Sequence, residues 1–386
     1  MAVGARTKFK LCNSDALFAG GESVSEIVQS PYSLALVGAS SLKGKEIKAL
    51  IEERHIRPHR LSLLDASDLQ GNLTEFDDEP VIIQPVDKES FEGMTLAIFA
   101  ASPDFTRDHW QLAESAGCDI IDVSYHLEAN SRAMLVAPQI GAVLKKENQP
   151  GICEAAGPGI FIPAHPVSIA IAAILRSLTP LGAVERSVVT VFEPVSEHGK
   201  AGVDELYNQT KNLLAFQKLP RTVFDAQVAF NLLTSFGAET RPTLQESARR
   251  ISAHTAWILD GSAPLTSLRV LHAPIFYGYA FNCFVELKET PSIDAIEQAL
   301  NCKPFSLWLD PDNHPSVVDA AGCDDILLGH VEKDSACNSG FWIWGVLDNC
   351  RLPAISAVEI AERLKHRAET EPSQGRGSQR QGGESL

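Results

Sequence analysis

The chain has 386 residues, enough for two domains with sizeable cores, since single domains mostly run to about 100–200 residues. Lysine and arginine number 33 against 49 aspartates and glutamates, and the net charge of -16 repels nucleic acids and anionic membrane surfaces. We see no apolar stretch of about 18 residues and no signal peptide, so we expect a cytoplasmic protein that binds neither nucleic acid nor membrane.

The eight cysteines are scattered along the chain and form no CxxC pair. Zinc sites and disulfide frameworks both depend on regular cysteine spacing, so this distribution predicts neither of them. It is typical of reduced thiols in the cytosol. We therefore expect no bound metal.

The first structural element follows residues 1–30, which show no sustained periodicity and are expected to form a flexible extension. An apolar run at 33–37 leads into a small-residue turn at 38–44, and helical spacing follows at 45–51. This order predicts a strand, a loop and a helix. The N-terminus of such a helix directs unpaired N–H groups and a positive dipole end at an anion such as pyrophosphate.

The turn after this strand has the spacing of a dinucleotide fingerprint with one glycine replaced. Gly38 and Gly44 hold the outer positions of GxxGxxG, and Ser41 holds the middle one. The turn can form, but the middle position, where the backbone approaches the phosphates most closely, here carries a side chain. We predict a nucleotide site formed by Gly38, Ser40, Ser41 and Gly44; the alternative is a turn that is kept only for packing.

A second strand, expected at 61–65, ends where a ribose-binding carboxylate follows the glycine turn in dinucleotide-binding folds. Asp65 and Asp68 are the candidates for this role. The alternative is an acid in a solvated loop, because Asp is common in turns.

Strands and helices continue to alternate further along the first half of the chain. Short apolar runs at 96–101 and 118–123 flank a helix that starts near Pro103. This alternation predicts an α/β domain over 31–156 with a Rossmann-type, doubly wound parallel sheet.

The pattern changes in the second half of the chain. A helix at 165–178 is apolar on nearly every side, which predicts that it is buried, and Pro166 suits its first turn. The other expected elements are a helix at 200–214 and strands at 187–195, 267–288, 325–332 and 341–347. Long strands with few helices between them predict a second, α+β domain over 157–350 with a mostly antiparallel or mixed sheet.

The last expected helix, at 353–367, lies in a segment at 351–368 that we expect to return to the first domain. The tail at 369–386 is rich in Gly, Ser, Gln and Glu. This composition predicts disorder, because it offers too little apolar surface to bury.

Five segments, in the same order, resemble aspartate-semialdehyde dehydrogenases. They are GASSLKGKE at 38–46, VSEHGKAGVDELYNQT at 195–210, QVAFNLL at 227–233, APIFYGYAFNCFVEL at 273–287 and VLDNCRLPAISAVEIAERL at 346–364. The resemblance implies a Rossmann-type NADP domain, an α/β dimerisation domain and a homodimer. The family's reaction is the reductive dephosphorylation of aspartyl phosphate to the semialdehyde, through a thioester on a cysteine.

That chemistry requires a thiolate at a helix N-terminus, a histidine that moves its proton, and arginines that hold carboxylate and phosphate. Aligning the family's Pro-Asn-Cys motif on Pro163 places His165 at the cysteine position. Counting back along the helix from Leu178 places Pro166 there instead. Neither residue is a cysteine, so the resemblance implies that the usual nucleophile has been lost.

The family's other functional positions are also replaced. Its substrate arginine and catalytic histidine fall on His272 and Tyr279, its glutamine on Glu193, and its phosphate-binding arginine on Glu128. Carboxylates at the last two positions are expected to repel an anionic substrate. Asp68 stands where many members have an arginine for the 2′-phosphate, which disfavours NADP and suits NAD at most.

We therefore interpret the chain as similar to the catalytically degenerate branch of the family. Its expected role is a dimeric scaffold or regulatory protein with weak binding of NAD or NADP, paired with itself or with an active paralogue. A related acyl-phosphate reductase, such as the N-acetylglutamyl-phosphate enzyme, meets the same objection, because that chemistry also uses a cysteine thioester.

The alternative is an active NAD(P)-dependent semialdehyde dehydrogenase of amino-acid biosynthesis with a relocated nucleophile. Cys153 or Ser168 would attack, and His165, His198 or His272 would carry the proton. The simpler interpretations are a buried inert thiol for Cys153 and a hydroxyl that bonds to the helix backbone for Ser168.

Overall fold

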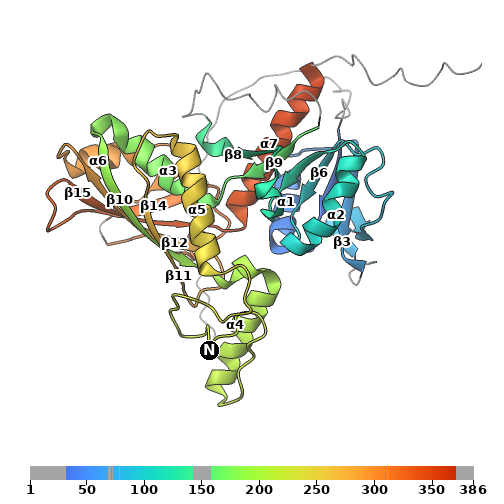
Figure 1. Cartoon of the computed structure of the whole chain (residues 1–386), viewed down its shortest axis with the longest axis horizontal. Helices are drawn as coiled ribbons and strands as arrows, with labels where there is room; N and C mark the ends of the chain where they lie inside the picture. The colour runs from blue at the N-terminus through green and yellow to red at the C-terminus, as the bar shows by residue number, and fades with distance from the viewer. Residues whose placement is uncertain are drawn as a thin grey trace, which may run out of the picture.

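The computed structural model describes residues 32–67, 71, 73–77, 79–141, 158–310 and 312–370, with side chains described to residue 365. It contains two large sheets with their own helices, which stand side by side in Figure 1. Asp68, Cys153, the predicted extension at 1–30 and residues 371–386 of the predicted tail lie outside the described residues.

The first sheet has seven strands, and every described pairing in it is parallel. In spatial order its strands are β5 (Gln84–Pro85), β2 (Arg60–Asp65), β1 (Ser33–Val37), β6 (Leu96–Phe99), β7 (Asp119–Asp122), β9 (Ile160–Pro163) and β8 (Ala133–Val136). Strands β1, β6 and β9 are buried along their whole length, as expected when helices cover both faces of a parallel sheet. The predicted Rossmann-type, doubly wound domain is confirmed.

The boundary between the two domains differs from the prediction. Strand β9 pairs with both β7 and β8, so the first sheet extends beyond residue 156, where the sequence analysis ended this domain. The physical reason is that the short apolar run at 160–163 directly precedes a buried helix, and apolar runs of this length do not reveal which sheet they join.

The second sheet has six strands and mixes parallel with antiparallel pairings, as predicted. In spatial order its strands are β11 (Ser267–His272), β10 (Val184–Glu193), β12 (Tyr279–Leu287), β15 (Gly340–Leu347), β14 (Ile326–Lys333) and β13 (Phe305–Leu307). A separate hairpin joins β3 (Leu73–Phe76) and β4 (Glu79–Ile82).

The helices are α1 (Leu42–Glu53), α2 (Pro103–Ser115), α3 (Pro166–Leu178), α4 (Gly199–Leu214), α5 (Leu244–Leu259), α6 (Ile293–Leu300) and α7 (Arg351–Thr370). Helices α1, α2, α3, α5 and α6 each begin with a side chain that caps a backbone N–H. Helix α5 is not among the predicted elements, although Thr243 and Glu246 form a capping box at its start. None of the described helices combines the length and the apolar character needed to cross a bilayer.

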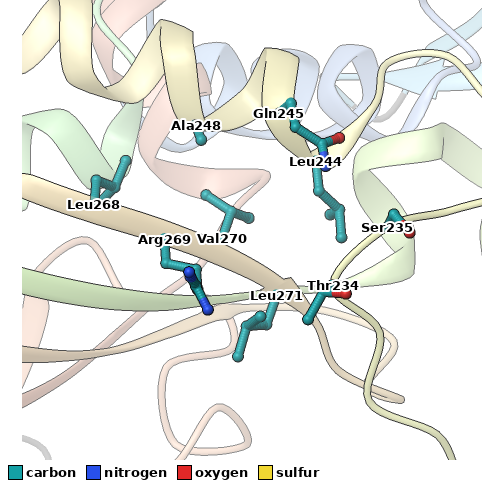
Figure 2. Close-up of a pocket in the computed structure, with 9 residues that line it drawn as sticks. All are labelled: Thr234, Ser235, Leu244, Gln245, Ala248, Leu268, Arg269, Val270 and Leu271. Atoms are coloured by element: carbon teal, nitrogen blue, oxygen red, sulfur yellow. The ribbon is translucent and has the colours of Figure 1, made fainter.

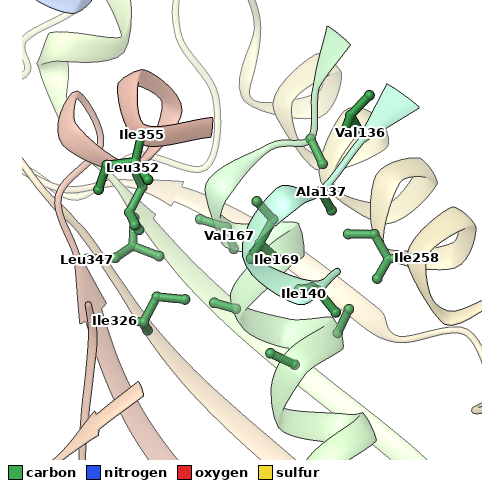
Figure 3. Packing of buried hydrophobic residues seen from close by; sticks show 14 of the residues in the cluster. Val136, Ala137, Ile140, Val167, Ile169, Ile258, Ile326, Leu347, Leu352 and Ile355 are labelled. Carbon is green, nitrogen blue, oxygen red and sulfur yellow. The ribbon is translucent and has the colours of Figure 1, made fainter. Parts of the chain in front are cut away.

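Helix α3 lies in a core shared by the two sheets. Eleven of its residues are buried, which agrees with the predicted all-round apolar helix. Figure 3 shows its residues Val167 and Ile169 among buried side chains from the first sheet, the second sheet and α7. The labelled neighbours are Val136, Ala137, Ile140, Ile258, Ile326, Leu347, Leu352 and Ile355.

Helix α7 follows the second sheet in sequence but packs against α1 of the first. Its first residue, Arg351, forms ion pairs with Glu46 at 3.0 Å and Glu53 at 2.7 Å, both on α1, and with Asp324 at 2.7 Å. The guanidinium therefore links the α1 side of the molecule to a loop of the second sheet.

Candidate functional site

The turn between β1 and α1 accepts only glycine at its two ends. Gly38 has φ +82°, and a Cβ built there would lie 2.4 Å from the backbone nitrogen of Ala101. A Cβ on Gly44 would lie 2.0 Å from the carbonyl oxygen of Gly38. Both distances are far inside van der Waals contact, so these glycines permit the close approach of β1, α1 and β6.

Ser41, at the middle position of the fingerprint, forms part of this turn. Its hydroxyl accepts a hydrogen bond from Gly44 N at 2.8 Å and donates one to the carbonyl of Ala100 at 2.8 Å, so it caps α1 and ties it to the end of β6. No hydrogen bond joins the backbone N–H of Leu42 or Lys43 to another described residue. These unpaired donors at the positive end of α1 fit a phosphate group.

Asp65 lies at the end of β2, directly beside the turn. Its carboxylate accepts hydrogen bonds from Ser40 N at 2.8 Å and from Ala66 N at 2.9 Å, and the residue is 8% exposed. It therefore fixes the turn to β2. Its predicted contact with a ribose, like the predicted effect of Asp68 on cofactor choice, stays a prediction.

His165 is the N-cap of α3, and Pro166 is the first residue of that helix. The Nδ1 atom of His165 accepts a hydrogen bond from Val167 N at 3.3 Å, and its Nε2 lies 3.3 Å from the hydroxyl of Tyr279. The ring is 3% exposed, and burial together with the charge of nearby His254 lowers its pKa well below the ordinary value. An uncharged imidazole thus fills the helix N-terminus where the resemblance expects a thiolate.

Tyr279 connects this histidine to Glu193. Its hydroxyl donates to Glu193 Oε2 at 3.5 Å, and both residues are fully buried. Burial, followed by the nearby charge of Glu197, raises the pKa of Glu193 to about 8. A carboxyl with this pKa holds its proton near neutral pH, which argues against the predicted repulsion of an anion by Glu193.

Glu128 meets cations that the sequence analysis missed. It accepts from Arg250 Nε at 2.7 Å and from His254 Nε2 at 3.0 Å, and both partners lie on α5. Burial alone would raise its pKa, but the bond from His254 and the charge of Arg250 lower it. Glu128 is thus ionised as predicted, but its charge is balanced by Arg250, which corrects the predicted open repulsion of a dianion.

The remaining proton-carrier candidates are held by backbone or aromatic neighbours. His272 is fully buried and donates from Nε2 to the carbonyl of Val228 at 3.2 Å. His198 packs edge-on against Phe224, and burial lowers its pKa to about 4. Neither position provides a poised base in the described residues.

Ser168 has no histidine partner in the part of the chain that the structure describes. Its buried hydroxyl donates to the carbonyl of Ile251 at 2.9 Å, across the contact between α3 and α5. Nucleophilic serine chemistry requires a base within hydrogen-bond reach, and in the described residues this hydroxyl has only a carbonyl acceptor. The geometry therefore favours the structural interpretation.

A separate hollow of about 480 Å³ lies between β11 and the start of α5 (Figure 2). Its lining residues are Thr234, Ser235, Leu244, Gln245, Ala248, Leu268, Arg269, Val270 and Leu271. This set contains no cysteine, histidine or carboxylate, so it offers neither a nucleophile nor a base. Across the described parts of the chain, no group of three or more His, Cys, Asp or Glu side chains is placed to hold a metal.

Two family models match the chain. The model described as semialdehyde dehydrogenase, NAD binding domain, matches residues 33–146, and the model described as semialdehyde dehydrogenase, dimerisation domain, matches residues 175–352. A USG-1 protein homolog from Pseudomonas aeruginosa is 32% identical over 347 residues, which cover 88% of this chain and 99% of that protein. Aspartate-semialdehyde dehydrogenase 2 from Vibrio cholerae is 27% identical over 86% of this chain and 97% of its own length.

Solved structures agree with this match. A probable aspartate-semialdehyde dehydrogenase from Pseudomonas aeruginosa superposes with a TM-score of 0.75 at 29% identity, covering 86% of this chain and 98% of its own. The aspartate semialdehyde dehydrogenase II of Vibrio cholerae, complexed with ASA, gives 0.76 at 26% identity, covering 87% and 98%. The two-domain fold described above is therefore the fold of these enzymes.

Proposed function

The chain belongs to the aspartate-semialdehyde dehydrogenase family, and we propose that it is a member without dehydrogenase activity that acts as a dimeric scaffold or regulatory protein. The proposal includes weak binding of NAD or NADP at the turn between β1 and α1. It also places the protein in the cytoplasm, which the free thiols of the described cysteines support.

The observation that carries this proposal is the occupant of the N-terminus of α3. The family's thioester chemistry requires a thiolate that this helix end stabilises. Here His165 caps the helix with Nδ1 and is buried against Tyr279, so its ring is neither charged nor free to attack. Glu193 and Tyr279 fill the adjoining space as buried, uncharged groups. Among the described residues, no group of equivalent role replaces what is lost.

The direct test is phosphate-dependent oxidation of aspartate semialdehyde, followed with NAD and with NADP. Aspartate-semialdehyde dehydrogenase 2 of Vibrio cholerae serves as the active control. We expect no turnover above the protein-free background. Turnover that disappears in Cys153→Ala or in Ser168→Ala, with the circular dichroism spectrum unchanged, would overturn the proposal and favour a relocated nucleophile.

The dimer is supported by an incompletely covered apolar face of the second sheet. Helices α3, α5 and α6 cover one face, where Val189 and Val191 of β10 are fully buried. On the opposite face Val188 is 37% exposed, and Phe192 is half-buried beside Trp344, with ring centroids 6.5 Å apart. A sheet face of this kind gains stability when another apolar surface covers it.

Light scattering measures the molar mass in solution, which for a dimer is twice the chain mass of 41.8 kDa. We expect Val188→Lys to shift the population toward monomer, because it places a charge on the apolar face. Leu73→Lys is the matched control, since Leu73 is 70% exposed on the β3–β4 hairpin of the first domain. Equal effects of both substitutions, or none for Val188→Lys, would place the interface elsewhere.

Nucleotide binding is tested by titration calorimetry and by the melting temperature with added NAD and NADP. The unpaired N–H groups of Leu42 and Lys43 and the tight glycine turn support this part of the proposal. We expect weak saturable binding of at least one nucleotide. The absence of both a heat signal and a melting shift with either nucleotide would remove it.

A further inference from the structure

Lys43 forms an ion pair across the boundary between the two domains. It lies on the first turn of α1, directly before Gly44 of the glycine turn, and its Nζ is 3.5 Å from Oε2 of Glu197. Glu197 lies in a 3-10 turn (Val195–His198) that directly follows β10 of the second sheet. The two side chains are only 19% and 12% exposed, so solvent screens this pair less than it screens a surface pair.

Glu197 is held firmly on its own side of the boundary. Its Oε1 accepts a hydrogen bond from Asn349 Nδ2 at 2.8 Å. The same amide also donates to Ser196 Oγ at 2.9 Å, and its oxygen accepts from Gly278 N at 2.8 Å. The carboxylate is therefore a fixed partner for the ammonium rather than a mobile surface charge.

A tyrosine ring and a guanidinium lie close to this ion pair, and the tyrosine hydroxyl lacks a hydrogen-bond partner among the described residues. The ammonium of Lys43 lies 5.5 Å from the ring centroid of Tyr125, and the Arg250 guanidinium lies 4.6 Å from the same centroid. The Tyr125 hydroxyl is buried and has no hydrogen-bond partner among the described residues. Lys43 thus lies on the helix turn that carries the unpaired N–H groups, and its ammonium lies over the Tyr125 ring near Glu197 of the second domain.

We propose that Lys43 is a nucleotide-responsive link between the two domains. Without nucleotide, Glu197 holds its ammonium; when NAD or NADP occupies the glycine turn, the phosphates compete for the same ammonium and weaken the link. The inference rests on the proposed nucleotide binding. It gives that binding a regulatory consequence, because the nucleotide then controls how tightly the first domain is tied to the second.

Competition for one ammonium predicts opposite effects for its two partners. Removing the Glu197 charge frees Lys43 for the phosphates, and removing the Lys43 charge takes the cation away from them. A partly buried pair worth about 0.5–1 kcal/mol corresponds to a change of about two- to fivefold in affinity. The gain from Glu197→Gln has to vanish when Lys43 is absent, because it acts through that residue.

The experiment measures the NADP and NAD dissociation constants of the full chain by titration calorimetry. The variants are Lys43→Met, Glu197→Gln, their combination and the control Lys45→Met. Gln at position 197 keeps an oxygen that can accept from Asn349. Lys45 is exposed on the same helix turn as Lys43 and forms no ion pair with a described residue. Hydrogen exchange at 195–198, with and without nucleotide, gives a readout that does not depend on affinity.

We expect Glu197→Gln to bind about two- to fivefold more tightly and Lys43→Met to bind more weakly by a similar factor. The double variant should match Lys43→Met, Lys45→Met should match the unmodified chain, and nucleotide should speed exchange at 195–198. Equal affinities for Glu197→Gln and Lys45→Met, or a gain that persists in the double variant, would overturn the link and leave nucleotide binding intact. Failure of the unmodified chain to bind either nucleotide would overturn both.

Discussion

The N-termini of α1 and α3 both carry the positive end of a helix dipole, but different side chains cap them. At α1 the cap is Ser41, and the following N–H groups of Leu42 and Lys43 are unpaired among the described residues. Lys43 also adds its own ammonium to this helix turn. At α3 the cap is the buried ring of His165, and Pro166 removes the next donor. Both helix ends carry a positive dipole that favours an anion. Among the described residues, the first leaves two successive backbone N–H groups, those of Leu42 and Lys43, unpaired to receive one.

The fold gives both helix ends a positive dipole, but the individual side chains at each end determine whether its N–H groups stay unpaired. The cap of α3 connects through Tyr279 to Glu193, and all three groups are buried and uncharged near neutral pH. Such a network contributes to packing. The turn at α1 keeps its geometry for a ligand, and the predictions below test whether the two sites differ in this way.

The largest effect is expected at the turn of α1. Gly38→Ala forces a Cβ to within 2.4 Å of Ala101 N at a residue with φ +82°. We expect a loss of more than about 4 kcal/mol in the free energy of unfolding, or failure to fold. Gly93→Ala is the control, because Gly93 has φ +73° but nothing within 4 Å of the added atom.

Urea denaturation separates the two contributions in these glycine variants. Gly93→Ala reports the strain of positive φ alone, about 1–2 kcal/mol. A similarly small loss for Gly38→Ala would mean that the turn tolerates a side chain, and the contrast between the two helix ends would then lose its basis.

The second effect belongs to the linked groups His165, Tyr279 and Glu193, here called the α3 cluster, and it depends on pH. The pKa of Glu193 is about 8 in the folded chain, against 4.5 for an ordinary glutamate. Between these values the folded chain holds a proton that the unfolded chain releases, so stability falls as pH rises through this window. Glu193→Gln removes this loss, and we expect it to gain about 3 kcal/mol over the unmodified chain at pH 7.

The unfolding free energy of Glu193→Gln should converge with that of the unmodified chain near pH 4.5, the ordinary glutamate value. Exposed Glu239→Gln is the control, for which we expect no such divergence. Parallel pH profiles for Glu193→Gln and the unmodified chain would show that Glu193 is ionised in the folded state. The α3 cluster would then hold a buried charge after all.

These charge states mark the limit of what the sequence predicts. The two-domain fold, the glycine turn and the buried helix followed from local patterns of apolar and small residues. The state of Glu193 did not, because it depends on burial by segments far away in sequence. Arg250 and His254 were missed together with α5, although Thr243 and Glu246 give the capping-box signal three residues apart. Their partner Glu128 lies more than 120 residues away along the chain, and local residue spacing does not predict contacts over such a separation.

The third effect appears on the acid side. His165 stays neutral in the folded chain at pH values where an ordinary histidine, with a pKa of 6.5, takes a proton. The unfolded chain therefore binds more protons, and stability is lost as pH falls below that value. His165→Asn keeps a capping oxygen and removes this proton, so we expect it to lose about 1.6 kcal/mol less between pH 6.5 and 5.

Exposed His59→Asn serves as the control for His165→Asn, and we expect it to leave the acid profile unchanged. An unchanged profile for His165→Asn as well would mean that His165 is protonated in the folded chain. The N-terminus of α3 would then carry a positive charge on its cap. It would differ from α1 in the charge of the cap and not only in the pairing of its N–H groups.

The smallest effect refines the comparison at α1. Ser41→Ala removes both the bond to Gly44 N and the bond to the Ala100 carbonyl, whereas Ser102→Ala at α2 removes only a cap bond to Phe105 N. A cap alone contributes about 1 kcal/mol, so we expect that loss for Ser102→Ala and a somewhat larger one for Ser41→Ala in urea denaturation. Nucleotide affinity should fall only in Ser41→Ala, because Ser41 fixes the turn that presents the free N–H groups. Equal losses of stability and of affinity in both variants would mean that Ser41 is an ordinary cap. The unpaired N–H groups at α1 would then not depend on Ser41 for binding a nucleotide.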